Sequence, residues 1–323
     1  MDIILKGFDS KNNPIELSNI LWYEHFIGKF GFEETFTIAL SKDVPFSLTK
    51  VVVTKENKKE SECFVDSIEI DANKNGIFYI IKLKNIVCRL LENQVKPTIH
   101  KTFNLEKLLR RYTKNLNISC KIPSAFNIEI ENFYVDIGMT AFDIIFFFFQ
   151  ITFKRYIFLN ENKQLTFSFF PTTQLYFGNY LKNSLNPING IKYNSIRIVD
   201  DRSKLISDAF LKIVYENNES DFLNLTQENS YAIDCNIKRT KYSTVPQMWQ
   251  VLPKNGAEFI VQKQNKKRFS YEIITFEKVD ISPGMIGKIK EIIDNKDVVA
   301  VAVLEKISQK GRKTKILFKN NNL

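Results

Sequence analysis

Residues 136–149 read DIGMTAFDIIFFFF. Thr140 and Asp143 have the spacing of a capping box, in which two side chains satisfy free backbone N–H groups at the first turn of a helix. The residues that follow are almost all apolar, and the four phenylalanines at 146–149 must point to all sides of that helix. A helix that is apolar on most sides packs between other layers, so this stretch predicts a helix wedged into a core.

The same phenylalanines allow a second interpretation, because proteins that bind single-stranded nucleic acid stack bases on exposed aromatic side chains. A stacking platform needs its rings on one face, whereas residues 146–149 surround the helix. We therefore predict that these side chains form a core, and that a ring left facing outward contacts a partner protein.

The segments around this helix complete a small α+β unit. Asn104 is a good helix cap, and Glu106 in the first turn suits the positive end of the helix dipole. The predicted elements are a helix at 105–112, strands at 118–121 and 127–135, and a hairpin of 155–159 with 165–170. Lys96-Pro97 precedes the unit and the turn-rich residues 186–190 follow it.

On either side of this unit, apolar and polar residues alternate with the period of half-buried strands. Within 1–95 the clearest runs are 35–40, 46–54, 63–70 and 78–83. After residue 190 the predicted elements are strands at 194–199, 211–215, 230–238, 257–261 and 270–279, a helix at 245–251, and a terminal hairpin of 298–307 with 312–318. Closely spaced strands form sandwiches or small barrels, so the predicted fold class is α+β and mainly β.

The 323 residues carry a formal net charge of +10, which makes nucleic acid or another anionic surface a candidate partner. The basic residues cluster at Lys263, Lys266, Lys267 and Arg268, and again at Lys310, Arg312, Lys313 and Lys315. Both clusters lie in or beside predicted hairpin turns, where lysines commonly protect a strand edge or form a solvated face. A small-barrel protein that binds nucleic acid through these hairpins is therefore the alternative interpretation.

The four cysteines are Cys63, Cys88, Cys120 and Cys235. They lie far apart without a CxxC pair, which predicts free, mostly buried thiols in a reducing compartment and no metal site. The N-terminus has no signal-peptide pattern. The most apolar stretch, 141–159, contains charged residues, and its longest uncharged run is about half the length of a bilayer span. We expect no membrane span and synthesis in the cytoplasm.

No standard catalytic motif is present, whether GxSxG, Walker loop, GxGxxG or HExxH. The two histidines are His25, in an aromatic stretch, and His100, near the joint between predicted domains. Neighbouring carboxylates occur at Glu33-Glu34, at Glu129 with Glu131, and at Asp200-Asp201. The second pair should lie on the solvated face of a strand and the third in a turn. We expect no catalytic, cofactor-binding or metal-binding residue, and we predict that the protein is not an enzyme.

Several segments, in this order, carry a resemblance to a known family. They are NLEKLL at 104–109, the strand 128–133, DIGMTAFDII at 136–145, QLTF at 164–167, and VDISPGMI at 279–286 ahead of a terminal hairpin with Gly311 in its turn. Their order resembles that of the late-control-D-like baseplate hub proteins of contractile phage tails and related bacteriocins. The chain departs from the family in its run of four phenylalanines and in residues 203–256, which do not match the family pattern.

The resemblance implies two tube-like β-barrel domains with an inserted small α+β domain. The first barrel would occupy 1–95 and be completed by strands near 191–202, the insert would occupy 96–190, and the second barrel with its terminal hairpin would occupy 203–323. Because the sequence ends just after that hairpin, we expect no appended cell-wall hydrolase.

The resemblance also implies a homotrimer, whose six barrels adapt a sixfold tail tube to a threefold central spike. The implied partners are further copies of the chain, the tail tube protein, the spike and the baseplate wedge components, with the tape-measure protein as a further candidate. The expected location is the tail baseplate of a virion or tailocin particle, after assembly in the bacterial cytoplasm.

Overall fold

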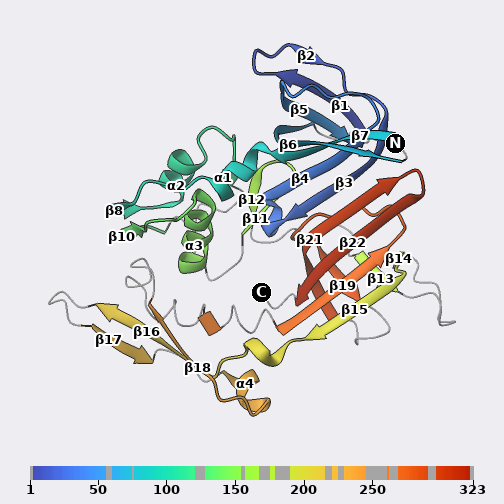
Figure 1. The fold of residues 1–323 in the computed structure, drawn as a ribbon. Helices are drawn as coiled ribbons and strands as arrows, with labels where there is room; N and C mark the ends of the chain where they lie inside the picture. The colour runs from blue at the N-terminus through green and yellow to red at the C-terminus, as the bar shows by residue number, and fades with distance from the viewer. Residues whose placement is uncertain are drawn as a thin grey trace.

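A computed structural model describes the chain at residues 3–55, 60–74, 76–120, 128–153, 157–166, 175–178, 190–214, 220–224, 229–244, 260–261, 268–289 and 296–320. Its largest element is a 14-stranded sheet that runs through two curved units (Figure 1). Helices and three smaller sheets lie beside it. The fold is therefore mainly β, as the alternating sequence pattern predicted.

The first unit is an antiparallel sheet of seven strands. They are β1 (Ile3–Asp9), β2 (Pro14–Ile15), β3 (Ile20–Gly28), β4 (Glu33–Leu40), β5 (Leu48–Lys55), β6 (Ser61–Asn73) and β7 (Gly76–Asn85). Their spatial order is β3-β4-β7-β6-β5-β1-β2. Alternate residues point inward, so Ile3 and Leu5 are buried while Ile4 is exposed. The inward face forms one core with Tyr23 and Phe36.

The insert follows the first unit and matches the predicted α+β pattern. Its elements are η2 (Ile86–Cys88), α1 (Arg89–Glu92), β8 (Thr98–Phe103), α2 (Leu105–Tyr112), β9 (Ser119–Cys120), β10 (Ile130–Val135), α3 (Ala141–Phe153), β11 (Phe158–Leu159) and β12 (Gln164–Thr166). The Asn104 side chain accepts a hydrogen bond from the Lys107 backbone N–H at 3.0 Å, so the predicted cap of α2 is confirmed.

Helix α3 forms the centre of the insert. The predicted capping box is confirmed, because Thr140 Oγ1 donates to Asp143 Oδ2 at 2.7 Å and the Asp143 N–H donates to Thr140 Oγ1 at 3.2 Å. Phe148 and Phe149 are fully buried, and Phe146 and Phe147 are half-buried. The phenylalanine run is therefore core, not a stacking platform for bases.

Among the described residues, the second unit also has seven strands around its own core. They are β13 (Leu175–Gly178), β14 (Gly190–Lys192), β15 (Ser195–Asp200), β19 (Phe269–Thr275), β20 (Ile286–Ile289), β21 (Lys296–Ser308) and β22 (Gly311–Asn320). Their inward side chains include Tyr193, Tyr271 and Phe318. An excursion between β15 and β19 holds η4 (Arg202–Lys204), β16 (Asp208–Val214), β17 (Ser220–Asn224), α4 (Ser230–Asp234) and β18 (Thr240–Thr244), with sheet order β17-β16-β18.

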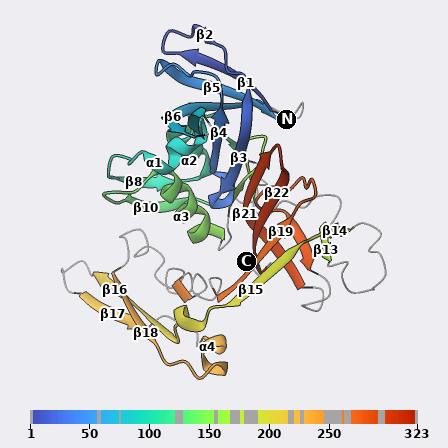
Figure 2. The same cartoon turned by 45° about the vertical axis from the view of Figure 1, so that its right-hand side comes forward.

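The two units share one sheet because β21 pairs with β3. The register runs antiparallel from Val303 opposite Ile27 to Ser308 opposite Trp22. The two views show the C-terminal hairpin β21–β22, in red, beside the blue strand β3 (Figures 1 and 2). The last strands of the chain thus extend the sheet made by the first ones.

Two sequence predictions need correction. The strands near 191–202 were expected to complete the first barrel, but β15 pairs with β19 and so belongs to the second unit. Residues 230–238 were expected to form a strand, but residues 230–234 form the helix α4. The predicted turn at 186–190, the helix at 245–251 and the strand at 257–261 lie largely or wholly outside the described residues.

The two units repeat the same strand order. Taken in chain order, β1 to β7 correspond to β13, β14, β15, β19, β20, β21 and β22, and each strand has the corresponding neighbours. One difference is β13, which runs parallel to β14 and β20, whereas β1 is antiparallel to β2 and β5.

The long hairpins of the two units agree in detail. Each hairpin has a shift of one residue in its pairing register, which falls just before Ser67 in β6–β7 and just before Ala302 in β21–β22. Ser67 and Ala302 both lie six positions before the last paired residue of their strand, Asn73 or Ser308. Both turns end at a glycine with φ of +123°, Gly76 and Gly311, a backbone angle that favours glycine. The chain is therefore built from two copies of one β topology with a helical insert between them.

Candidate functional site

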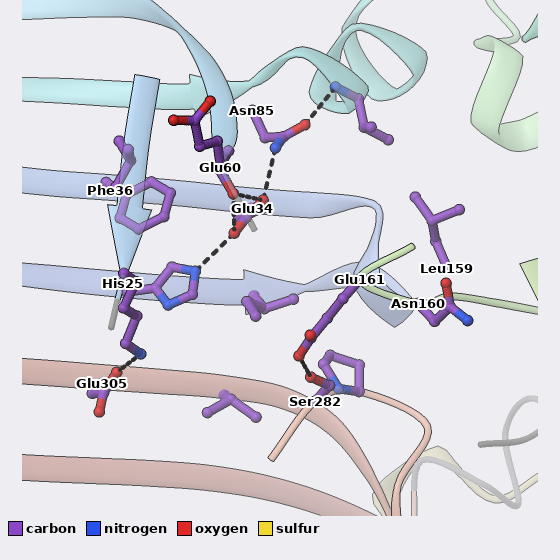
Figure 3. A pocket seen from close by; sticks show the side chains of 18 of the residues that line it. His25, Glu34, Phe36, Glu60, Asn85, Leu159, Asn160, Glu161, Ser282 and Glu305 are labelled. Carbon is purple, nitrogen blue, oxygen red and sulfur yellow. Dashed lines mark hydrogen bonds and ion pairs between the residues drawn. The ribbon is translucent and has the colours of Figure 1, made fainter. Parts of the chain in front are cut away.

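A pocket of about 390 Å³ lies where the three parts of the chain meet. Its walls come from β3 to β6 of the first unit, from the β11–β12 turn of the insert, and from residues 279–283 with β21 and β22 of the second unit (Figure 3). The lining is therefore drawn from all three parts, and some of the polar contacts inside the pocket cross from one part to another.

The Glu34 side chain contacts three polar side chains in the pocket. Its carboxylate lies 3.0 Å from His25 Nε2, and it accepts hydrogen bonds from Ser61 Oγ at 3.2 Å and from Asn85 Nδ2 at 2.8 Å (Figure 3). The His25 ring stacks on Phe36 at 4.3 Å between centroids. Burial alone would raise the pKa of Glu34, but the hydrogen bonds from His25, Ser61 and Asn85 together bring this pKa below its ordinary value.

This arrangement differs from a nucleophilic catalytic triad. In such a triad the histidine lies between the serine and the carboxylate and takes the proton from the serine. Here Glu34 lies between Ser61 and His25, and both contact the carboxylate. A carboxylate held by three donors is a structural anchor with a weakened basicity. None of the described His, Cys, Asp and Glu side chains form a group of three that could hold a metal ion.

A second set of ionic contacts ties the first unit to the terminal hairpin. Glu305 in β21 is only 6% exposed and pairs with Lys55 of β5. Its other oxygen lies 3.2 Å from Arg312 Nε in β22. On the opposite wall, Ser282 Oγ of the second unit donates to Glu161 of the insert at 3.0 Å. The pocket is thus a polar seam that holds all three parts in register.

The pKa of Glu34 gives a testable pH dependence. Because its folded pKa is lowered, its charged form stabilises the fold above the ordinary carboxyl pKa of 4.5, and this contribution is lost as pH falls through the folded pKa. We expect Glu34→Gln to be less stable than the parent at pH 7, with the difference narrowing as the pH is lowered below 4.5. Urea unfolding at several pH values measures the free energy of unfolding of both proteins. A difference between them that stays constant with pH would contradict the prediction.

The structure places the other histidine and carboxylates apart from this pocket. His100 Nε2 lies 2.9 Å from the Tyr112 hydroxyl inside the insert, and burial lowers the pKa of His100. Glu129 and Glu131 are exposed, as predicted. Asp200 pairs with Arg202 and Arg268, and Asp201 accepts the Ser203 N–H at 3.0 Å, so this pair forms the predicted turn.

Three of the five described residues of the basic clusters are paired with carboxylates, and the other two, Lys310 and Lys313, are exposed. Arg312 pairs with Glu305, and Lys315 lies 2.8 Å from Glu272. Arg268 is paired with Asp200, while Lys263, Lys266 and Lys267 lie outside the described residues. Cations already paired with carboxylates are poor ligands for phosphate, so this geometry does not favour the nucleic-acid interpretation.

Sequence reasoning named His25 and Glu34 but did not bring them together. The missing step is register: β3 and β4 form a hairpin in which His25 faces Phe36 and Ile27 faces Glu34. His25, Ile27, Glu34 and Phe36 all lie on the face of the hairpin that lines the pocket. Residues 22–26 read Trp-Tyr-Glu-His-Phe, which do not alternate between aromatic and polar side chains, so this stretch held no local signal for the register.

Comparison with known proteins finds similarity in the fold. No family model and no curated protein sequence matches the chain. A tail protein of Neisseria meningitidis matches with a TM-score of 0.71 and 11% identity, over 100% of this chain and 98% of that one. The prophage MuSo2 43 kDa tail protein of Shewanella oneidensis matches with a TM-score of 0.69 and 8% identity, over 98% of this chain and 96% of that one.

A third similar structure comes from a secretion system. The Escherichia coli c3393 protein is described as a component of the type VI secretion system that is structurally similar to the bacteriophage T4 tail proteins gp27 and gp5. It matches with a TM-score of 0.56 and 8% identity, over 98% of this chain and 76% of that one. The chain therefore has the fold of phage tail proteins. In the portion that the structure describes, no helix is long and apolar enough to cross a membrane.

Proposed function

We propose that this chain, which has the fold of phage tail proteins, is the structural hub of a contractile tail-like baseplate. In this role it forms a homotrimer that adapts the sixfold tail tube to the threefold central spike. The observation that carries the proposal is the repeated β unit: one chain holds two copies of the same strand order. Three chains then present six similar units to a sixfold partner and three identical chains to a threefold one.

The pocket supports a structural role for the chain. Its polar side chains are engaged with one another, within the first unit as Glu34 with His25, and between parts as Glu305 with Lys55 and Ser282 with Glu161. We propose that the protein is not an enzyme and that its partners are the tail tube protein, the spike and the baseplate wedge components. The proposed location is the tail baseplate of a virion or tailocin particle.

We propose a three-part division of the chain whose limits differ from those that the resemblance implied. The strands of the first unit end at Asn85, and the insert begins at η2 (Ile86–Cys88), before the expected limit at residue 96. The second unit begins with β13 and β14 and includes β15, so its strands start before the expected limit at residue 203.

The oligomeric state tests the proposal directly. We expect the purified protein to have about three times the 37.7 kDa mass of one chain in light scattering or native mass spectrometry. Three-chain particles should persist on dilution into the low micromolar range, because obligate interfaces bury roughly 2,000 Å² or more. A particle of one-chain mass at every concentration would contradict the proposal.

A further inference from the structure

Two strand edges, one in each unit, have no partner among the described strands. Beyond Phe64, no described strand pairs with the edge of β6 that faces away from β7. The corresponding strand β21 is different, because β20 covers residues 296–299 and β3 covers residues 303–308. β15, the counterpart of β3, pairs with β19 on one edge and with no described strand on the other.

The junction between β3 and β21 within the chain therefore has a missing counterpart, a junction between β15 and β6. These two edges belong to different units of one chain, so the same chain cannot repeat the junction by the same geometry. A second copy of the chain can form this junction, because β6 in its first unit can lie beside β15 in the second unit of the preceding copy. The first unit of each copy then follows the second unit of the preceding copy, just as the second unit follows the first within one chain. Exposed strand edges are natural templates for pairing with another chain.

The registers of the two units fix which residues would face each other. Counted back from the two turns, Ile70 in β6 corresponds to Glu305 in β21, and Asp71 corresponds to Lys306. Read across the sheets, the facing residues are His25, Phe36 and Leu83 in the first unit and Ile198, Tyr271 and Phe318 in the second. Leu83 and Phe318 both lie seven positions after the turn glycine, so Ile198 corresponds to His25 and Arg197 to Glu24.

The side chains that this register brings together are complementary. In the existing junction, Lys306 Nζ donates to Glu24 at 2.5 Å. At the corresponding positions of the missing junction, Asp71 would face Arg197, which reverses the two charges and keeps the attraction. One position further on, Ile70 would face Ile198, and these side chains are 50% and 38% exposed in the single chain.

We propose that β15 of one copy pairs antiparallel with the free half of β6 of the next copy, with Ile198 opposite Ile70 and Arg197 opposite Asp71. The inference rests on the proposed homotrimer, and it assigns the surfaces that join its chains. The contact is head-to-tail, so three copies close a ring in which six β units alternate between junctions inside a chain and junctions between chains. The two exposed isoleucines become buried in every junction between chains.

Paired cysteines test the register. We expect Ile70→Cys with Ile198→Cys to give covalent dimers and trimers on a non-reducing gel after oxidation or treatment with a short thiol cross-linker, since directly opposed Cβ atoms lie about 5 Å apart. Each single variant should stay uncross-linked. All variants carry Cys120→Ser and Cys235→Ser, because these two native thiols are partly exposed. Burial raises the pKa of the Cys63 and Cys88 thiols, which keeps these two cysteines unreactive. The matched control is Ile4→Cys with Ile198→Cys, because Ile4 is also exposed but lies on β1.

A charge exchange tests the same pair without new thiols. Asp71→Arg alone and Arg197→Asp alone should each raise the trimer dissociation constant by about tenfold or more, since like charges directly opposed repel. Combining both should restore most of the loss. Glu131→Arg, an exposed charge reversal on the insert, should leave assembly unchanged.

The outcomes separate this inference from the proposed function. A three-chain particle whose 70–198 pair does not cross-link, or whose double charge exchange fails to restore assembly, overturns the proposed edges and leaves the hub intact. A particle of one-chain mass at every concentration overturns the hub itself.

Discussion

Replacing Gly31 by alanine is expected to destabilise the protein by about 3 kcal/mol or more. Gly31 joins β3 to β4 with φ of +92°, and a Cβ there would lie 2.1 Å from the backbone oxygen of Leu159 in the insert. A backbone atom cannot rotate away as a flexible side chain can. The first unit and the insert would have to separate at this point, and the polar pocket beside it would open.

The control for this variant is Gly138→Ala. Gly138 has a similar φ of +86°, but a Cβ there meets no atom within 4 Å. It should cost only the backbone strain of about 1–2 kcal/mol. Thermal unfolding followed by circular dichroism compares the two variants. Equal decreases in the unfolding midpoint would contradict the prediction, because the close approach to Leu159 would then add nothing to the cost of Gly31→Ala.

Glu305→Gln is expected to cost about 3 kcal/mol. The carboxylate is almost fully buried between Lys55 and Arg312, so its neutralisation leaves two cations in the seam without their counter-charge. The control is Glu16→Gln, whose ion pair with Lys42 lies on the surface with side chains 74% and 46% exposed. Surface pairs contribute little, so this change should leave the free energy of unfolding almost unchanged.

A triple variant sharpens the test of the buried ions. Replacing Lys55, Glu305 and Arg312 together by methionine, leucine and methionine removes every charge at once, and buried ion sets are often replaced by apolar residues without loss of stability. We expect most of the stability to return. Chemical denaturation measures all three variants, and a triple variant less stable than Glu305→Gln would mean that the ionic contacts themselves stabilise the seam.

Local signals predicted much of the fold. The capping box of Thr140 and Asp143 and the cap at Asn104 depend on residues three positions apart, so their helices could be predicted directly from the sequence. The terminal hairpin was equally clear, because its turn lies between two long alternating strands. The prediction of a strand at 230–238 was wrong because alternation over a few residues fits a short helix as well as a strand, and residues 230–234 form α4.

The candidate site depends on pairings that no local pattern specifies. Alternation can mark Glu305 as part of a strand, but its partner on β3 lies far away in sequence, and nothing near residue 305 names His25 as the facing residue. The assignment of β15 to the first barrel failed for the same reason, since strand order follows from global packing. The repeat of the two units is visible in their shared strand order, bulge and turn, because these are backbone features that their differing side chains do not reveal.

The pairing of β3 with β21 also has a consequence for synthesis of the chain. β3 is complete by Gly28, but its outer partner spans Val303–Ser308. At roughly 5–20 residues per second, a ribosome needs on the order of 14–56 s to deliver that partner, and the first sheet carries an open edge meanwhile. Because β6 has the same topology as β21, neighbouring nascent chains on one messenger could exchange strands during this interval. The misassembled fraction of newly made protein should therefore grow with the number of ribosomes on each messenger. Slower translation initiation should lower this fraction, because it places nascent chains further apart.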